Sequence, residues 1–342
     1  MEQFAAAIQS AADAMFMPWT VGLLLAVGAF LTIRLRFVQI VRFPDAVRET
    51  LVNRQSGTSG ALAPFQAFMT ALAGSIGTGN IVGVATAIVS GGPGALFWIW
   101  CYGFFAMAIK FAEASLGLHF RVAHGESVLS GPMYYLRDGL KQPWLAWVFA
   151  LIGGVACLFT TPFTQPNSVA VVFDSQLELH GLRSNAWTLP GGVAIDPERL
   201  VLGCILAVLT WLVIVRGVKS IGRAAARLSP LKVGLYLAGG MIVLGTHAAE
   251  LPATLALVFR EAFSLQAAAG TAAGVGVWQA IRYGLARGIY ANEAGYGTAA
   301  VAYGTAKSTH PEQQGLNAVM EVFIISFVTS SISALAVLVT GV

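Results

Sequence analysis

The residues with the clearest chemical potential form a short segment at positions 74–80, which reads Gly-Ser-Ile-Gly-Thr-Gly-Asn. The segment interrupts an apolar run from residue 61 to residue 89. Each of its three glycines weakens a helix by about 1 kcal/mol relative to alanine. Thr78 and Asn80 would place a hydroxyl and an amide at membrane depth, where an unpaired polar group costs several kcal/mol. A partner for these groups is therefore expected.

The length of the same run also argues against one straight helix. As a continuous helix it would extend roughly 43 Å, whereas the hydrocarbon core of a bilayer is about 30 Å thick. A helix that unwinds at its midpoint explains the glycines, the polar groups and the excess length together. Broken helices of this kind form ligand sites at the middle of the membrane.

The composition predicts an all-α integral membrane protein. Hydrophobic residues make up 56% of the chain and charged residues 11%, against about 25% charged residues in soluble domains. We interpret residues 1–342 as one transmembrane domain, with a leading helix at 19–35, core helices 1–5 within 61–247 and core helices 6–7 within 262–341. The expected core helices, in order, are 61–89, 94–118, 144–172, 200–215, 230–247, 262–285 and 316–341.

Basic residues predict the orientation of these helices, because cytoplasmic loops collect Lys and Arg. Most of the 20 Lys and Arg residues fall in segments 34–54, 121–141, 216–232 and 282–307, whereas the opposite loops hold Arg183, Arg199 and Arg260. This distribution places the N-terminus outside the cell and the protein in the inner (plasma) membrane. The net charge of +4 then reflects topology and contact with the lipid bilayer, and no nucleic-acid partner is expected.

A second glycine-rich segment lies five helices after the first. Residues 269–276 read Ala-Gly-Thr-Ala-Ala-Gly-Val-Gly and include Gly274 and Gly276. The predicted topology gives the two interrupted helices opposite directions, as in inverted repeats with a binding site between the breaks. The alternative is that these glycines only permit close helix packing.

Several polar residues near helix ends allow two interpretations each. Lys110 and Glu113 are three residues apart and are expected to pair on one helix face near the headgroups, or else to serve in gating or proton transfer. Asn292 and Glu293 follow helix 6, where they either cap the helix or contact Arg287 in an inner gate.

Nothing in the sequence indicates an enzyme. Such a protein would need a nucleophile with a base, paired carboxylates or a metal cluster at membrane depth. The five histidines fall in loops or at helix ends without ligand spacing, and they are His119, His124, His180, His247 and His310. We therefore expect no cofactor.

A series of short motifs runs through the chain. In order, they are TALAGSIGTGNIVGVATAI at 70–88, GGPGALFW at 91–98, KFAE at 110–113, GPMYY at 131–135, QPNS at 165–168, RG at 287–288, NEAG at 292–295 and EVF at 321–323. Taken together, the motifs resemble those of the alanine or glycine:cation symporter family, the sodium:alanine symporters, and the resemblance runs from about residue 20 to the end of the chain.

This resemblance implies a LeuT-type fold of two inverted five-helix repeats, preceded here by the leading helix. It also implies sodium-driven import of alanine or glycine. The positions that match the family's substrate site are Ser75, Thr78, Gly79, Asn80 and Gln165, with Gly274 and Gly276 at the second break.

The chemistry of the breaks agrees with such a substrate. Half-helix N-termini can hold a carboxylate, and unwound carbonyls can hold an ammonium group or sodium. No Asp or Glu lies in either break, which favours a neutral zwitterion. Sodium prefers oxygen ligands, for which Asn80, Ser326 and Ser330 are candidates, although hydroxyls in a helix often bond to their own backbone instead.

Two departures from the family pattern stand out. Ile325 occupies a position where alanine carriers typically have an acid. The family pattern also has three further helices after core helix 7, so about eight helices are expected here, and we interpret the chain as a fragment of a longer protein. The alternatives are a truncated product that does not transport, a proton-coupled amino-acid carrier and a passive channel. The sequence does not indicate the oligomeric state.

Overall fold

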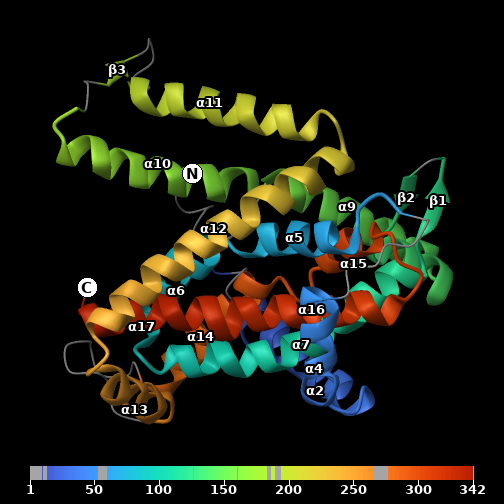
Figure 1. The fold of residues 1–342 in the computed structure, drawn as a ribbon, viewed down its shortest axis with the longest axis horizontal. Coiled ribbons are helices and arrows are strands. Elements are labelled where there is room, and N and C mark those ends of the chain that lie inside the picture. The colour runs from blue at the N-terminus through green and yellow to red at the C-terminus, as the bar shows by residue number, and fades with distance from the viewer. Residues whose placement is uncertain are drawn as a thin grey trace.

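The computed structural model describes residues 10, 14–52, 60–125, 127–159, 161–182, 186–188, 194–264 and 276–341. Long helices dominate it, as Figure 1 shows. The first part of the described chain holds η1 (Met15–Thr20), α2 (Val21–Arg34), α3 (Val38–Val41), α4 (Phe43–Leu51), α5 (Pro64–Ser75), α6 (Thr78–Gly91) and α7 (Ala95–His119). Two short elements, α8 (Pro132–Tyr134) and η2 (Tyr135–Gly139), lead to α9 (Pro143–Phe159) and α10 (Thr161–Leu179).

The second part of the chain continues the helical pattern. Its helices are α11 (Pro197–Ile214), α12 (Val218–Thr246), α13 (Leu251–Ala262), α14 (Val277–Asn292), α15 (Thr298–Gly304), α16 (Pro311–Phe323), η3 (Ile324–Thr329) and α17 (Ser330–Thr340). Strands occur only as two antiparallel hairpins in the described chain. They are β1 (Val122–His124) with β2 (Ser127–Leu129), and β3 (Trp187–Thr188) with β4 (Ala194–Ile195).

Seven segments of the described residues are long and apolar enough to cross a membrane. They are Met15–Arg34, Pro64–Gly91, Ala95–His119, Pro143–Leu179, Pro197–Ile214, Val218–Thr246 and Pro311–Thr340. They coincide with the predicted leading helix and core helices 1–5 and 7. The predicted helix at 262–285 is not one of them, because α13 ends at Ala262, α14 begins at Val277 and residues 265–275 lie outside the described residues.

One predicted boundary is wrong by a full three turns. Core helix 5 was expected to begin at residue 230, yet α12 begins at Val218 and carries Pro230 in its interior. Membrane helices tolerate an interior proline because neighbouring groups can satisfy the freed carbonyl. The basic residues Lys219, Arg223 and Arg227 are therefore part of the helix and not of the preceding loop.

Helix α7 lies at the centre of the packing. Its side chains Tyr102, Ala106 and Ile109 belong to a buried apolar cluster shared with α14 and α16. Glycines bring neighbouring backbones unusually close to it: a Cβ at Gly117 would lie 2.4 Å from the carbonyl oxygen of Ala300. Small residues at membrane helix contacts allow this approach.

The broken helix α5–α6 and helix α14 lie side by side in opposite directions. A Cβ at Gly79, near the start of α6, would meet Tyr290, near the end of α14. A Cβ at Gly91, at the end of α6, would instead meet Gln279, near the start of α14. The antiparallel arrangement agrees with the relation expected from the sequence.

The basic segments 121–141, 216–232 and 282–307 meet at one end of the bundle, to the right in Figure 1. There Arg121 donates hydrogen bonds to the carbonyl oxygens of Ala306 (2.6 Å) and Ser308 (2.9 Å), and burial lowers the pKa of its guanidinium. Leu62 forms a parallel bridge with Ala306 and also packs where a Cβ at Gly222 would lie, which brings the start of α12 to the same end.

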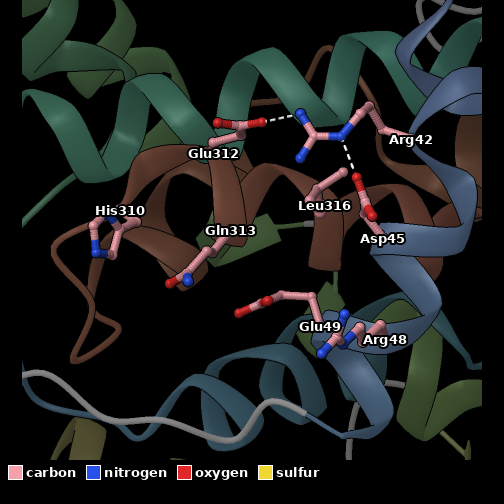
Figure 2. Close-up of a pocket in the computed structure, with 8 residues that line it drawn as sticks. All are labelled: Arg42, Asp45, Arg48, Glu49, His310, Glu312, Gln313 and Leu316. Atoms are coloured by element: carbon pink, nitrogen blue, oxygen red, sulfur yellow. Dashed lines mark hydrogen bonds and ion pairs between the residues drawn. The ribbon is translucent and has the colours of Figure 1, made fainter.

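The short helix α4 is fastened to the start of α16. Arg42 forms ion pairs with Asp45 and Glu312 (Figure 2). Thr50 donates a buried hydrogen bond of 2.8 Å to Asn317 Oδ1. Between the two helices lies a pocket of about 350 Å³ that also includes Leu316. These contacts tie the segment after the leading helix to core helix 7.

Helix α11 packs little against the rest of the described chain. It contains no buried residue, and Leu209 and Trp211 are 55% and 62% exposed. An apolar surface of this kind suits contact with lipid tails.

Candidate substrate site

The first broken helix provides the central geometry. Helix α5 ends at Ser75 and α6 begins at Thr78. Between them Ile76 is extended (φ −84°, ψ 97°), and Gly77 is also outside the helical conformation (φ −151°, ψ −149°). The interruption therefore lies at residues 76–77, within the segment that the glycines predict.

The backbone freed by this break is satisfied by side chains. Asn80 Nδ2 donates a hydrogen bond of 2.8 Å to the carbonyl oxygen of Ser75, across the break. The carbonyl oxygen of Asn80 itself accepts a bond of 2.6 Å from Ser333 Oγ of α17. Asn80 is fully buried. Its side chain thus holds the two half-helices together, and α17 holds the start of α6.

A cavity of about 750 Å³ opens beside the break. Gly74, Ser75 and Gly79 line it from the broken helix, and Gln165 lines it from α10. Apolar residues of α9 form much of the remaining wall, together with residues around the end of α14, namely Phe149, Ile152, Ala156, Tyr290, Glu293 and Tyr296.

Gln165 lies directly against the break. A Cβ at Gly77 would come within 2.6 Å of Gln165 Nε2, so a larger residue at position 77 would displace the amide from the break. The Thr78 N–H donates a hydrogen bond of 3.5 Å to Gln165 Oε1. The N-terminus of α6 therefore already engages a polar oxygen at the edge of the cavity.

The structure distributes the predicted substrate residues unevenly. Ser75, Gly79 and Gln165 line the cavity, and Thr78 is half-buried beside Gln165. Asn80 is not part of the lining. Gly274 lies outside the described residues, and Gly276 precedes α14 as its N-cap without lining the cavity.

Two of the three candidate sodium ligands, Ser326 and Ser330, have other hydrogen-bond partners. Ser326 Oγ and the Asn292 amide are hydrogen-bonded to each other, at 2.8 and 3.0 Å. Ser330 Oγ donates to the carbonyl oxygen of Ile325 at 2.9 Å, the bonding back to the helix that hydroxyls often make. Asn80 Oδ1 is buried and has no hydrogen-bond partner within the described residues. The sodium role of these residues stays a prediction.

A buried charge cluster next to the break was missed by sequence reasoning. Lys110 Nζ forms an ion pair of 2.6 Å with Glu321 Oε1, and both side chains are at most 1% exposed. The same carboxylate accepts hydrogen bonds from Ser75 Oγ (2.8 Å) and Tyr303 OH (3.0 Å). The sequence did contain a signal for this pair: Lys110 lies inside the apolar segment 94–118 and Glu321 inside the apolar segment 316–341. Charged residues of opposite sign inside membrane segments usually pair with each other.

The expected pairing of Lys110 with Glu113 is therefore wrong. Lys110 points to Glu321 in the core instead of reaching the headgroups. Glu113 Oε1 accepts hydrogen bonds from the backbone N–H groups of Gly295 (2.8 Å) and Gly297 (3.3 Å). Side chains three apart on a helix can diverge when different neighbours offer better partners.

The capping interpretation of Asn292 and Glu293 fits the structure, because Asn292 is the last residue of α14 and Glu293 is its C-cap. The Asn292 amide bonds to the carbonyl oxygen of Gly288 in the last turn and to Ser326 inside the core. Arg287 lies against Gly83 of α6. Glu293 ends α14 in a left-handed conformation (φ 53°) and lines the cavity.

The described chain has seven candidate membrane spans, and one of them is broken beside a cavity with polar groups. These features define a multi-pass α-helical membrane protein. The chain belongs to the sodium:alanine symporter family, whose sequence profile matches residues 1–342. It is thus a member of a transporter family and not of an enzyme family.

Named relatives give the same assignment. The chain is 37% identical over 330 residues to the sodium/alanine symporter AgcS of Methanococcus maripaludis, covering 95% of this chain and 68% of that protein. It is 36% identical over 319 residues to the putative sodium/proton-dependent alanine carrier protein YrbD of Bacillus subtilis, covering 93% and 61%. It is also 36% identical over 294 residues to the probable sodium/glutamine symporter GlnT of Bacillus subtilis, covering 86% and 57%.

Proposed function

We propose that this chain forms the substrate-binding part of a symporter that imports a small neutral amino acid, alanine or glycine, together with sodium. The observation that carries the proposal is the cavity of about 750 Å³ at the break of α5–α6. It combines a half-helix N-terminus, a side-chain amide and mostly apolar walls. The family assignment and the name of the relative AgcS support the choice of sodium and alanine.

The break offers a zwitterion partners of both kinds. The substrate carboxylate would bind at the start of α6, where the helix dipole favours negative charge, and would replace Gln165 Oε1 as the acceptor of the Thr78 N–H. The ammonium group would face the end of α5 near Gly74 and Ser75, with the Glu293 carboxylate also on the cavity wall. The apolar side chains of α9 would surround the substrate side chain.

The antiparallel packing of α6 against α14 supports an inverted-repeat fold of the LeuT type. In that fold the two broken helices run in opposite directions past the substrate. The described residues include the N-terminal end of α14 and the C-terminal end of α13 on either side of the second glycine-rich segment.

Uptake by proteoliposomes tests the proposal. In proteoliposomes of the full-length symporter, labelled alanine should accumulate with an inward sodium gradient and not when choline replaces sodium. Thr78→Ala and Asn80→Ala should abolish accumulation, because the first removes the hydroxyl beside the proposed carboxylate position and the second removes the amide that joins the half-helices. Thr86→Ala is the matched control, since the Thr86 hydroxyl donates to the Gly83 carbonyl oxygen within α6. Near-normal uptake by both site variants would refute the site.

The same assay separates the alternatives. Accumulation that follows a pH gradient and ignores sodium would indicate a proton-coupled carrier, and uptake without saturation would indicate a channel. The cavity lies within the range of about 300–1,000 Å³ typical of small-molecule sites, so its volume does not restrict the substrate to alanine. Competition by glycine and glutamine therefore belongs in the same experiment.

A further inference from the structure

The carbonyl end of α5 has an unusual set of partners. The last carbonyl groups of a helix lack partners within the helix. In α5 the Ser75 carbonyl accepts from Asn80, whereas the carbonyl oxygens of Ala73 (3.2 Å) and Ile76 both accept from Lys232 Nζ. A single ammonium group from another helix thus caps this half-helix at the break.

Lys232 reaches this position along the contact between α12 and α5. One turn earlier on α12, Ser229 donates a buried hydrogen bond of 3.3 Å to the carbonyl oxygen of Met69. Lys232 as a whole is an exposed residue, while its ammonium donates hydrogen bonds to the two carbonyl oxygens. The head group is held by these two carbonyl oxygens, and Lys232 has no ion pair within the described residues.

The electrostatics of the position suit any small monovalent cation. A helix C-terminus carries roughly half a negative charge, and carbonyl oxygens at a broken helix can bind either an ammonium group or sodium. The neighbouring Ser75 carbonyl accepts a hydrogen bond from Asn80 Nδ2. The other side-chain atom of that amide, Asn80 Oδ1, is buried and has no hydrogen-bond partner in the described part of the chain. Two carbonyl oxygens, those of Ala73 and Ile76, thus meet at the position that the lysine ammonium fills.

We propose that the Lys232 ammonium is a tethered cation at the carbonyl end of α5 and that sodium competes with it for the oxygens of Ala73 and Ile76. This inference rests on the proposed function in one point, namely that the competing ion is sodium. Sodium must displace Lys232 to bind here, so the lysine lowers the apparent sodium affinity of this position.

Thermal unfolding of the purified chain in detergent tests the inference. Sodium chloride is titrated against choline chloride at constant ionic strength. Sodium should raise the unfolding temperature of Lys232→Met, because the tethered competitor is gone. The sodium concentration at half of the maximal rise should be at least about threefold lower than for the unaltered chain. Lys232→Arg should respond like the unaltered chain. Lys219→Met is the matched control, since Lys219 is an exposed lysine near the start of the same helix.

A rescue experiment adds an independent measurement. Methylammonium, which carries the lost head group, should stabilise Lys232→Met and leave Lys219→Met unchanged. The inference is overturned if Lys232→Met shows the sodium response of the unaltered chain, or if it cannot be purified in a folded state even in saturating sodium. Because the readout is binding and not uptake, a positive sodium response without transport would leave this inference standing and refute only the proposed function.

Discussion

The buried ion pair between Lys110 and Glu321 makes the sharpest prediction about stability. The two charges are 2.6 Å apart, and their side chains are 1% and 0% exposed. Replacing one partner leaves the other as an uncompensated buried charge, which typically costs about 3–5 kcal/mol. We therefore expect Glu321→Gln and Lys110→Met each to lower the free energy of unfolding by about that amount.

The double variant Lys110→Met/Glu321→Gln should recover most of this loss. With both charges removed, no isolated charge remains, and such replacements are often neutral for stability. The amide oxygen introduced at position 321 would still accept a hydrogen bond from Ser75 or Tyr303, which now bond to the Glu321 carboxylate. A coupling energy of at least about 2 kcal/mol is expected between the two sites.

Reversible unfolding in mixed detergent micelles can measure this double-mutant cycle. The exposed pair Arg137 and Asp138, whose side chains are 47% and 39% exposed, provides the control, and its cycle should show no measurable coupling. Single variants whose effects simply add up to that of the double variant would refute the reasoning. They would mean that Lys110 and Glu321 do not stabilise each other in the folded protein.

Two further predictions concern topology and packing. In a background without native cysteines, a cysteine at position 184 should react with an impermeant thiol reagent from outside the cell, whereas one at position 220 should not; the reverse pattern would overturn the orientation. Gly117→Ala should destabilise the protein by about 1–3 kcal/mol, because its Cβ would lie 2.4 Å from the Ala300 carbonyl oxygen. Gly203→Ala, with nothing within 4 Å of its Cβ, should be neutral or stabilising in the same unfolding assay, and equal effects of the two would contradict the packing argument.

The sequence by itself determined the helical membrane class and the first break. Apolar run length identifies spans because the bilayer has a fixed thickness, and it located the leading helix and core helices 1–5 and 7. Glycines beside polar residues identify a break because both are unfavourable in a membrane helix. The residues next to that break, Ser75 and Gly79, accordingly line the cavity.

Tertiary structure alone decided which polar groups meet. Lys110 is close to Glu113 in sequence but pairs with Glu321, 211 positions away. Asn80 was expected to face the substrate, yet it spans the break inside the core. Lys232 was counted with the basic segment 216–232 that predicts orientation, whereas in the structure it caps the end of α5. Local spacing shows which side chains share a helix face, whereas the choice of partner depends on which helices lie side by side, and that depends on packing across the whole chain.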